Sequence, residues 1–115
     1  MAFNGRTMLA LSSAILVSAT SIASAQSGIA SIYSGEKTAN GEWAYATRLT
    51  AAHKTLPFGT MVKVTHKKTG KSVVVRINDR GPYIKGRIID LTPAGARALG
   101  FSGLAPVELT VMNRT

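Results

Sequence analysis

Apolar and polar residues alternate strictly along residues 61–67, and residues 72–79 form a second alternating run with Val73, Val75 and Ile77 on one face. Alternation with a period of two is typical of β-strands that turn one face toward a core. The residues between them, 68–71, read KTGK, and such a glycine-containing segment predicts a tight turn. The three segments together predict a β-hairpin.

The pattern upstream of this hairpin is less regular. Residues 28–34 carry their larger apolar side chains in a loose alternation and predict a strand. Residues 35–49 contain two glycines, an Asn-Gly pair and no sustained period, so they predict a long loop, a place where function often resides. Residues 50–60 predict a helical turn with Thr50 as its N-cap, ended by a proline and a glycine.

Three further elements are predicted downstream. Residues 86–91, GRIIDL, predict a short strand. A helix over residues 93–99 follows, because Thr92 is a good N-cap and Pro93 suits the first helical position. Residues 106–112 alternate again and predict a final strand.

Two segments of the chain resemble each other. Residues 51–65 and residues 94–111 both pass from an alanine-rich stretch through Leu-Pro-Phe or Leu-Gly-Phe into an alternating strand. This similarity suggests a fold built from two related halves. About six short strands and one or two short helices predict a mainly β domain closed into a barrel, which leaves no exposed sheet edge.

The N-terminus has the pattern of a signal peptide. Arg6 is the only charged residue before Glu36, an apolar run covers residues 8–17, and residues 23–25 read Ala-Ser-Ala. We therefore predict a signal peptide over residues 1–25 and a single domain over residues 26–115. The alternative, an uncleaved membrane anchor, is disfavoured because a spanning helix needs about 20 apolar residues.

Charge and cysteine content narrow the function classes. The chain carries 14 Lys and Arg against five Asp and Glu and contains no cysteine. An exported basic domain is suited to anionic wall polymers, and export argues against a nucleic acid partner; the alternative is that the lysines form a solvated face. Without cysteine, the chain has no disulfide, no thiol nucleophile and no site for a lipoprotein lipid. We expect a monomer, periplasmic or secreted, with no stable membrane anchor.

Few motifs for catalysis are present. No G-x-S-x-G nucleophile elbow occurs, TGKS lacks the first glycine of a phosphate-binding loop, and the two histidines do not have metal-ligand spacing. We therefore predict no metal and no organic cofactor. The acidic residues number only five: Glu36, Glu42, Asp79, Asp90 and Glu108.

Asp79 has the most informative position among these acids. By strand parity it shares a face with Val75 and Ile77, whereas Arg76 and Arg80 point the other way. Partial burial disfavours the charged form of a carboxyl group, which suits a general acid at neutral pH. The alternative is an aspartate that accepts backbone N–H groups in the following turn.

Five blocks of the sequence together resemble the RlpA (rare lipoprotein A) family: residues 38–42, 49–64, 73–92, 96–100 and 105–111. The resemblance implies a six-stranded double-psi β-barrel. It also implies a lytic transglycosylase that cleaves the MurNAc–GlcNAc β-1,4 bond of peptidoglycan glycan strands and leaves 1,6-anhydro-MurNAc ends. Members are described as preferring strands stripped of stem peptides. Because related barrels include expansins, the alternative is a non-catalytic wall-binding or wall-loosening module.

The family's functional residues match Glu42, His53 and Asp79. The resemblance gives Asp79 the acid/base role and Glu42 the stabilisation of positive charge at the anomeric carbon, or a share of the proton transfer. His53 would orient a carboxylate or bind sugar; its alternative is to cap a turn. Asp90 is the competing acid or a substrate-binding residue, with support of the helix at Thr92 as its structural alternative.

Four further residues are predicted to bind the glycan. Tyr33, Trp43 and Tyr45 can stack on sugar rings, although Tyr33 is also a candidate core residue. Arg80 completes the predicted substrate-binding set.

Overall fold

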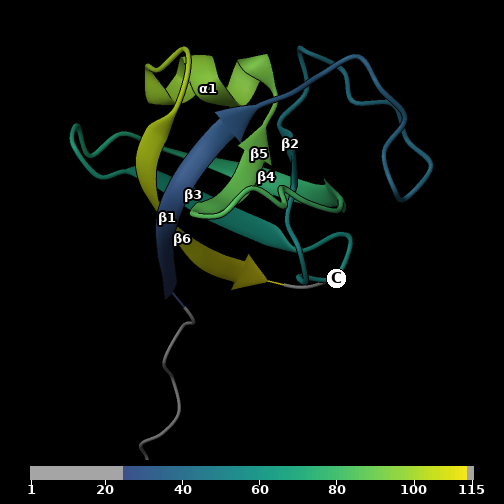
Figure 1. Ribbon diagram of the computed structural model, residues 1–115, viewed down its shortest axis with the longest axis horizontal. Helices are drawn as coiled ribbons and strands as arrows, with labels where there is room; N and C mark the ends of the chain where they lie inside the picture. The colour runs from purple at the N-terminus through teal and green to yellow at the C-terminus, as the bar shows by residue number, and fades with distance from the viewer. Residues whose placement is uncertain (1–24, 114–115) are drawn as a thin grey trace, which may run out of the picture.

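The computed structural model describes residues 25–113, and these form a closed six-stranded β-barrel with one short helix (Figure 1). The strands in chain order are β1 Ala25–Ile32, β2 Thr50–Ala52, β3 Met61–His66, β4 Ser72–Asp79, β5 Arg87–Leu91 and β6 Ala105–Asn113. The prediction of a mainly β barrel is confirmed. Of the predicted signal peptide, only Ala25 belongs to the described residues. No helix among them is long and apolar enough to cross a membrane.

The barrel has two halves of equivalent topology. The strand order is β1-β5-β2-β4-β3-β6, closed by pairing of β6 with β1. In one half β1 pairs in parallel with β5 and antiparallel with β6; in the other, β4 pairs in parallel with β2 and antiparallel with β3. The similar segments found in the sequence lie at equivalent places, since each leads into β3 or β6. The arrangement matches the double-psi barrel that the resemblance implied.

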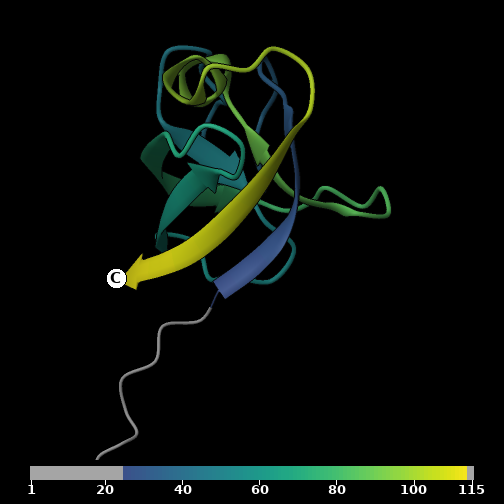
Figure 2. The ribbon, with the colours of Figure 1, turned by 90° about the vertical axis from the view of Figure 1, so that its left-hand side faces the viewer.

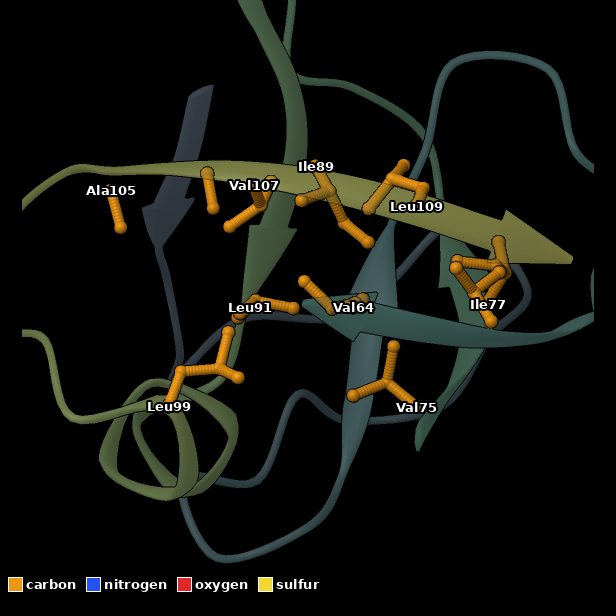
Figure 3. Packing of buried hydrophobic residues seen from close by; sticks show 12 residues of the cluster. Val64, Val75, Ile77, Ile89, Leu91, Leu99, Ala105, Val107 and Leu109 are labelled. Carbon is orange, nitrogen blue, oxygen red and sulfur yellow. The ribbon is translucent and has the colours of Figure 1, made fainter. Parts of the chain in front are cut away.

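The barrel interior is filled by side chains from all six strands and the helix (Figure 3). Val64, Val75, Ile77 and Leu91 are fully buried there, so the faces assigned by alternation in β3 and β4 are confirmed. Burial of a side chain of this size contributes about 1.5–3 kcal/mol. Leu99 of the helix packs into the same cluster and joins the helix to the barrel.

The helix α1, Pro93–Leu99, forms where it was predicted and covers one end of the barrel (Figure 2). Thr92 is its N-cap, with Oγ1 accepting a hydrogen bond from the Gly95 backbone N–H at 3.4 Å. Gly100 ends it with φ at 81°, a left-handed conformation that favours glycine. The cap satisfies backbone groups that a seven-residue helix otherwise leaves unpaired.

The prediction of a helical turn at residues 50–60 is wrong. Residues Thr50–Ala52 form β2, which pairs in parallel with β4 and antiparallel with β5 and so closes the barrel. All three residues are buried, which removes the alternation by which an exposed strand is recognised. Thr50 is therefore a strand residue and not an N-cap, and the turn begins only after β2.

Candidate active site

Four residues form a row across neighbouring strands of the barrel wall. Asp90 of β5 lies between Ser31 of β1 and Ala52 of β2 in the register of the sheet. Ala52 in turn lies beside Asp79 of β4. The two candidate acids therefore flank one small alanine, with backbones about 10 Å apart, since adjacent strands are about 4.8 Å apart.

Asp79 lies at an irregularity of its strand. The register between β2 and β4 shifts just before it, which makes Asn78 an extra residue of β4. The bulge places Asp79 on the face of Ala52 and Asp90, so the prediction that Asp79 shares a face with Val75 and Ile77 is wrong. The carboxyl group is nearly buried, with 8% of the residue exposed, and Oδ1 accepts hydrogen bonds from the backbone N–H groups of Ala39 and Arg80, both at 2.8 Å. Bonds to backbone N–H groups were the alternative interpretation of this residue; its catalytic role stays a prediction.

The Arg80 side chain, directly after β4, bonds to the turn after β2 and forms no ion pair with Asp79. Its Nη1 donates to the backbone oxygens of His53 at 3.1 Å and Leu56 at 2.8 Å. The guanidinium also lies over the Phe58 ring, 4.1 Å from the centroid. Arg80 therefore holds the turn after β2, and its contact with substrate stays a prediction.

Glu42 is carried by the long loop between β1 and β2, which was predicted as a loop. Its Oε1 accepts a hydrogen bond from Asn78 Nδ2 at 2.9 Å, and both carboxylate oxygens contact the Arg76 guanidinium, at 3.1 and 3.3 Å. The hydrogen bond from Asn78 and then those from Arg76 lower the pKa of Glu42 below its ordinary value. Glu42 is therefore ionised at neutral pH, although its side chain is 44% exposed.

A cavity of about 270 Å³ opens beside this carboxylate. It is lined by Glu42, Trp43, Tyr45, Arg48, Thr50 and Arg76. Trp43 and Tyr45 are about half exposed, at 48% and 50%, and Arg48 lies over the Tyr45 ring, 5.1 Å from its centroid. The structure thus brings two of the predicted stacking residues to one cavity with Glu42.

Tyr33, directly after β1, is bonded to a residue beside each of the two aspartates. Its backbone N–H donates to the oxygen of Leu91 at 2.9 Å, and its hydroxyl donates to Asn78 Oδ1 at 3.4 Å. Burial, and then the negative charges of Asp79 and Asp90, raise the pKa of the phenol well above its ordinary value. Tyr33 therefore remains protonated and can act only as a hydrogen-bond donor or weak acceptor. Its ring is half-buried, which is compatible with packing on the core as well as with contact to a sugar ring.

His53 begins the turn that follows β2. Its Nδ1 accepts hydrogen bonds from the backbone N–H groups of Thr55 and Leu56, both at 3.1 Å, and its Nε2 lies 2.9 Å from Gln26 Oε1. Acceptance at Nδ1 places the proton on Nε2, which then donates to Gln26. Burial, and then the charges of Arg80 and Lys54, lower the pKa of His53, so the ring is neutral. These contacts are those of the turn-capping alternative; a role toward substrate stays a prediction.

Asp90 is half-buried and makes a different kind of contact. Ser31 Oγ donates a hydrogen bond to its Oδ1. The N-cap of the following helix is Thr92, so the Asp90 side chain is bound to β1 and not to the helix N-terminus. No group of three or more acidic, histidine or cysteine side chains in residues 25–113 is arranged to hold a metal ion.

Sequence reasoning missed Ser31, Ala52 and Asn78. Ser31 and Ala52 join the site only through pairing between strands far apart in the sequence, and β2 itself was not predicted. Asn78 left a local signal, because parity places it on the same face as Arg76, where a buried amide can meet a loop carboxylate. Its burial depends on the loop folding over it, which parity alone does not show.

Comparison with known proteins agrees with this geometry. Residues 25–109 match the family model described as lytic transglycolase. The chain is 51% identical over 104 residues to the probable endolytic peptidoglycan transglycosylase RlpA of Nostoc, covering 84% of this chain and 28% of that protein. It is 50% identical over 91 residues to the endolytic peptidoglycan transglycosylase RlpA of Campylobacter jejuni, covering 74% of this chain and 33% of that protein.

Among solved structures, the barrel resembles a point mutant of the Clavibacter michiganensis expansin in complex with cellohexaose. The TM-score is 0.60 at 25% identity, covering 78% of this chain and 51% of that one. The chain spans about a third or less of the length of the two RlpA proteins that it matches. With this family model over most of its length and relatives at half identity, the chain belongs to the RlpA family of lytic transglycosylases.

Proposed function

We propose that this chain is a lytic transglycosylase that cleaves the β-1,4 bond between MurNAc and GlcNAc in peptidoglycan glycan strands. The observation that carries the proposal is the contrast between two neighbouring carboxyl groups. Glu42 is held ionised by Arg76 and Asn78, whereas Asp79 forms no ion pair among the described residues. The reaction needs one group of each kind, a fixed anion and a carboxyl able to exchange a proton.

In the proposed mechanism, the Asp79 carboxyl protonates the glycosidic oxygen as the bond to the MurNAc anomeric carbon breaks. The C6 hydroxyl of the same MurNAc attacks that carbon and closes the 1,6-anhydro ring. The Asp79 carboxylate then takes the proton of the C6 hydroxyl, which restores the acid. No water enters, so the second carboxylate that a hydrolase uses to activate water or attack the sugar is not needed.

Glu42 would stabilise the positive charge that develops at the anomeric carbon. Its lowered pKa supports this role over proton transfer, because a group that stays ionised is a poor acid at neutral pH. The exposed rings of Trp43 and Tyr45 beside Glu42 support glycan binding in the same cavity.

Digestion of purified sacculi, followed by mass spectrometry of the released fragments, tests the proposal. Wild-type protein should release fragments with anhydro-muramic ends, and Asp79→Ala should release none. If Asp90→Ala abolishes turnover while Asp79→Ala leaves it unchanged, the acid is Asp90. Release of fragments that all carry ordinary reducing ends would contradict a lytic reaction.

A second candidate is a non-catalytic, expansin-like module that binds the wall. The similarity to an expansin solved in complex with cellohexaose favours it, since a protein that shares this fold over about half of its length binds a glycan. Cosedimentation with sacculi without any released fragment, under conditions in which a known lytic enzyme is active, would favour this candidate over the enzyme.

We also propose that the chain is exported as a monomer, with cleavage after Ala25. The Ala-Ser-Ala sequence before that bond supports cleavage there. N-terminal sequencing of protein recovered from the periplasm or medium should begin at Gln26. Recovery of an intact N-terminus in the membrane fraction would contradict the proposal.

A further inference from the structure

Asn78, the extra residue of β4, connects two side chains that are distant in the sequence. It is only 1% exposed, and its side-chain amide is engaged at both ends. Nδ2 donates a hydrogen bond to Glu42 Oε1 at 2.9 Å, and Oδ1 accepts one from the Tyr33 hydroxyl at 3.4 Å. The Tyr33 hydroxyl is thus joined to the Glu42 carboxylate through one buried amide.

These two contacts determine which way the Asn78 amide faces. If the amide turned over, its oxygen would face the Glu42 carboxylate, and two acceptors would meet there. The Tyr33 hydroxyl stays protonated at neutral pH, because burial and then the charges of Asp79 and Asp90 raise its pKa well above the ordinary value. It can therefore donate to Oδ1, which favours the orientation in which Nδ2 faces Glu42.

The loop backbone around Glu42 is held without help from Tyr33. Asn40 Oδ1 accepts hydrogen bonds from the Glu42 backbone N–H at 3.0 Å and from the Thr38 hydroxyl at 2.7 Å. The Asn40 backbone N–H in turn donates to the Asn78 backbone oxygen at 3.2 Å. None of these bonds involves the Tyr33 hydroxyl, so its removal should act on side chains and leave the loop backbone in place.

The polar groups around the Glu42 carboxylate come from β4, from the loop itself and from the facing cavity wall: Arg76, Asn78, Asn40, Arg48 and Tyr45. The side chain of Arg76 is 38% exposed, so its long guanidinium can follow the carboxylate to more than one position. The Asn78 side chain is short and buried, so its N–H group defines a single position. Arg76 therefore contributes charge, whereas Asn78 determines where the carboxylate lies.

We propose that Tyr33 is a positioning residue for Glu42 and acts through the Asn78 amide, whose orientation its hydroxyl selects. The inference rests on the proposed function, in which Glu42 supplies a fixed negative charge to the anomeric carbon. Such a charge is most effective when it is already in place as the positive charge develops. Tyr33 thus contributes through its hydroxyl and not by stacking its ring on a sugar, the role predicted from the sequence.

Tyr33→Phe separates the two roles, because it removes the hydroxyl and keeps the ring. Loss of this hydrogen bond should lower kcat on soluble glycan strands about three- to tenfold and leave KM within about twofold. The pKa of Glu42, followed by ¹³C NMR of its carboxyl carbon, should rise, and the acid limb of the pH–rate profile should move to higher pH. Tyr83→Phe, at a tyrosine that is 74% exposed, is the matched control and should change none of these.

A double-mutant cycle with Asn78→Ala tests whether the effect passes through the amide. Asn78→Ala alone should raise the pKa of Glu42, because the hydrogen bond from Asn78 is the main cause that lowers it. Adding Tyr33→Phe should then raise this pKa no further. Asn78→Ser takes its place in the cycle if the alanine variant does not fold.

Wild-type kcat in Tyr33→Phe, or an equal effect of Tyr33→Phe with and without the Asn78 amide, would overturn the inference. A raised KM with unchanged kcat would also overturn it, because that pattern indicates contact with substrate. If wild type releases no anhydro ends from sacculi, the proposed reaction fails. The titration of Glu42 across the cycle still decides the role of Tyr33, since it needs no turnover.

Discussion

Glu42 and Asp79 are carboxyl groups held by the same loop, yet their surroundings differ in kind. Glu42 is exposed and contacts a guanidinium and a side-chain amide, which fix its negative charge. Asp79 is nearly buried and, within residues 25–113, its carboxylate accepts hydrogen bonds from backbone N–H groups, while the Arg80 guanidinium bonds to the turn after β2. The comparison shows how one site can hold Glu42 as a permanent anion and leave Asp79 without a counter-charge among the described residues.

Replacing each candidate acid in turn tests this division most strongly. Asp79→Asn keeps an oxygen that can accept both backbone hydrogen bonds but removes the proton donor, so kcat should fall about 10²–10⁴-fold. Asp90→Asn should cost less than tenfold, because its carboxylate contacts only Ser31 within the described residues. Release of soluble fragments from labelled sacculi gives the rates. Comparable losses in the two variants would remove the distinction between the aspartates.

Asn78 joins the two regions, since it directly precedes Asp79 on β4 and its side-chain amide donates a hydrogen bond to Glu42. It is almost fully buried, and Asn78→Ala removes its hydrogen bond to Glu42 as well as side-chain packing. We expect a loss of about 1–3 kcal/mol in the free energy of unfolding, measured by urea denaturation. A change within the ~0.5 kcal/mol typical of surface positions would show that the loop is held in some other way.

Arg76→Met tests whether a fixed charge on Glu42 matters for turnover. Without the guanidinium the pKa of Glu42 should rise, so the acid limb of the pH–rate profile should move to higher pH. We expect kcat to fall about tenfold, equivalent to about 1.4 kcal/mol of lost charge stabilisation. Lys63→Met, an exposed cation on β3, is the control. An unchanged acid limb would indicate that Glu42 does not act as an anion in the reaction.

The smallest expected effect is on stability against pH. The folded-state pKa of Glu42 lies below its ordinary value of 4.5, so the unfolded chain binds more protons near that pH. The resulting stabilisation is complete above pH 4.5 and disappears as the pH falls through the folded-state pKa. It should stay below about 1 kcal/mol because the group is exposed. Urea unfolding of wild type and Glu42→Gln should differ at pH 6, and the difference should shrink as the pH falls below 4.5; a constant difference would contradict this origin.

The sequence predicted correctly those elements whose pattern lies within a few consecutive residues. The alternation in β3 and β4 and the Thr-Pro start of α1 each appear within a few residues, and the structure has all three. Strand β2 was missed because Thr-Ala-Ala is buried on every side and owes its conformation to strands β4 and β5. Pairing between strands that are distant in the sequence also determines which residues meet in the candidate site.

The candidate site shows the same limit residue by residue. Parity along β4 placed Asp79 on the face of Ile77, which the bulge at Asn78 reverses, whereas the resemblance pointed to Glu42. Neither could show that Gln26 reaches the His53 ring, because that contact joins the start of β1 to the turn after β2. The extra residue Asn78 was also out of reach, since a bulge is defined by the partner strand and not by the strand that contains it.

The central claim is that Asp79 drives a cleavage in which no water takes part. Digestion of sacculi in ¹⁸O-labelled water, with wild type and Asp79→Asn side by side, tests it most directly. The account predicts that wild type releases anhydro-MurNAc ends without ¹⁸O and that Asp79→Asn releases almost none. Reducing ends that carry ¹⁸O, or anhydro ends released by Asp79→Asn at the wild-type rate, would contradict it.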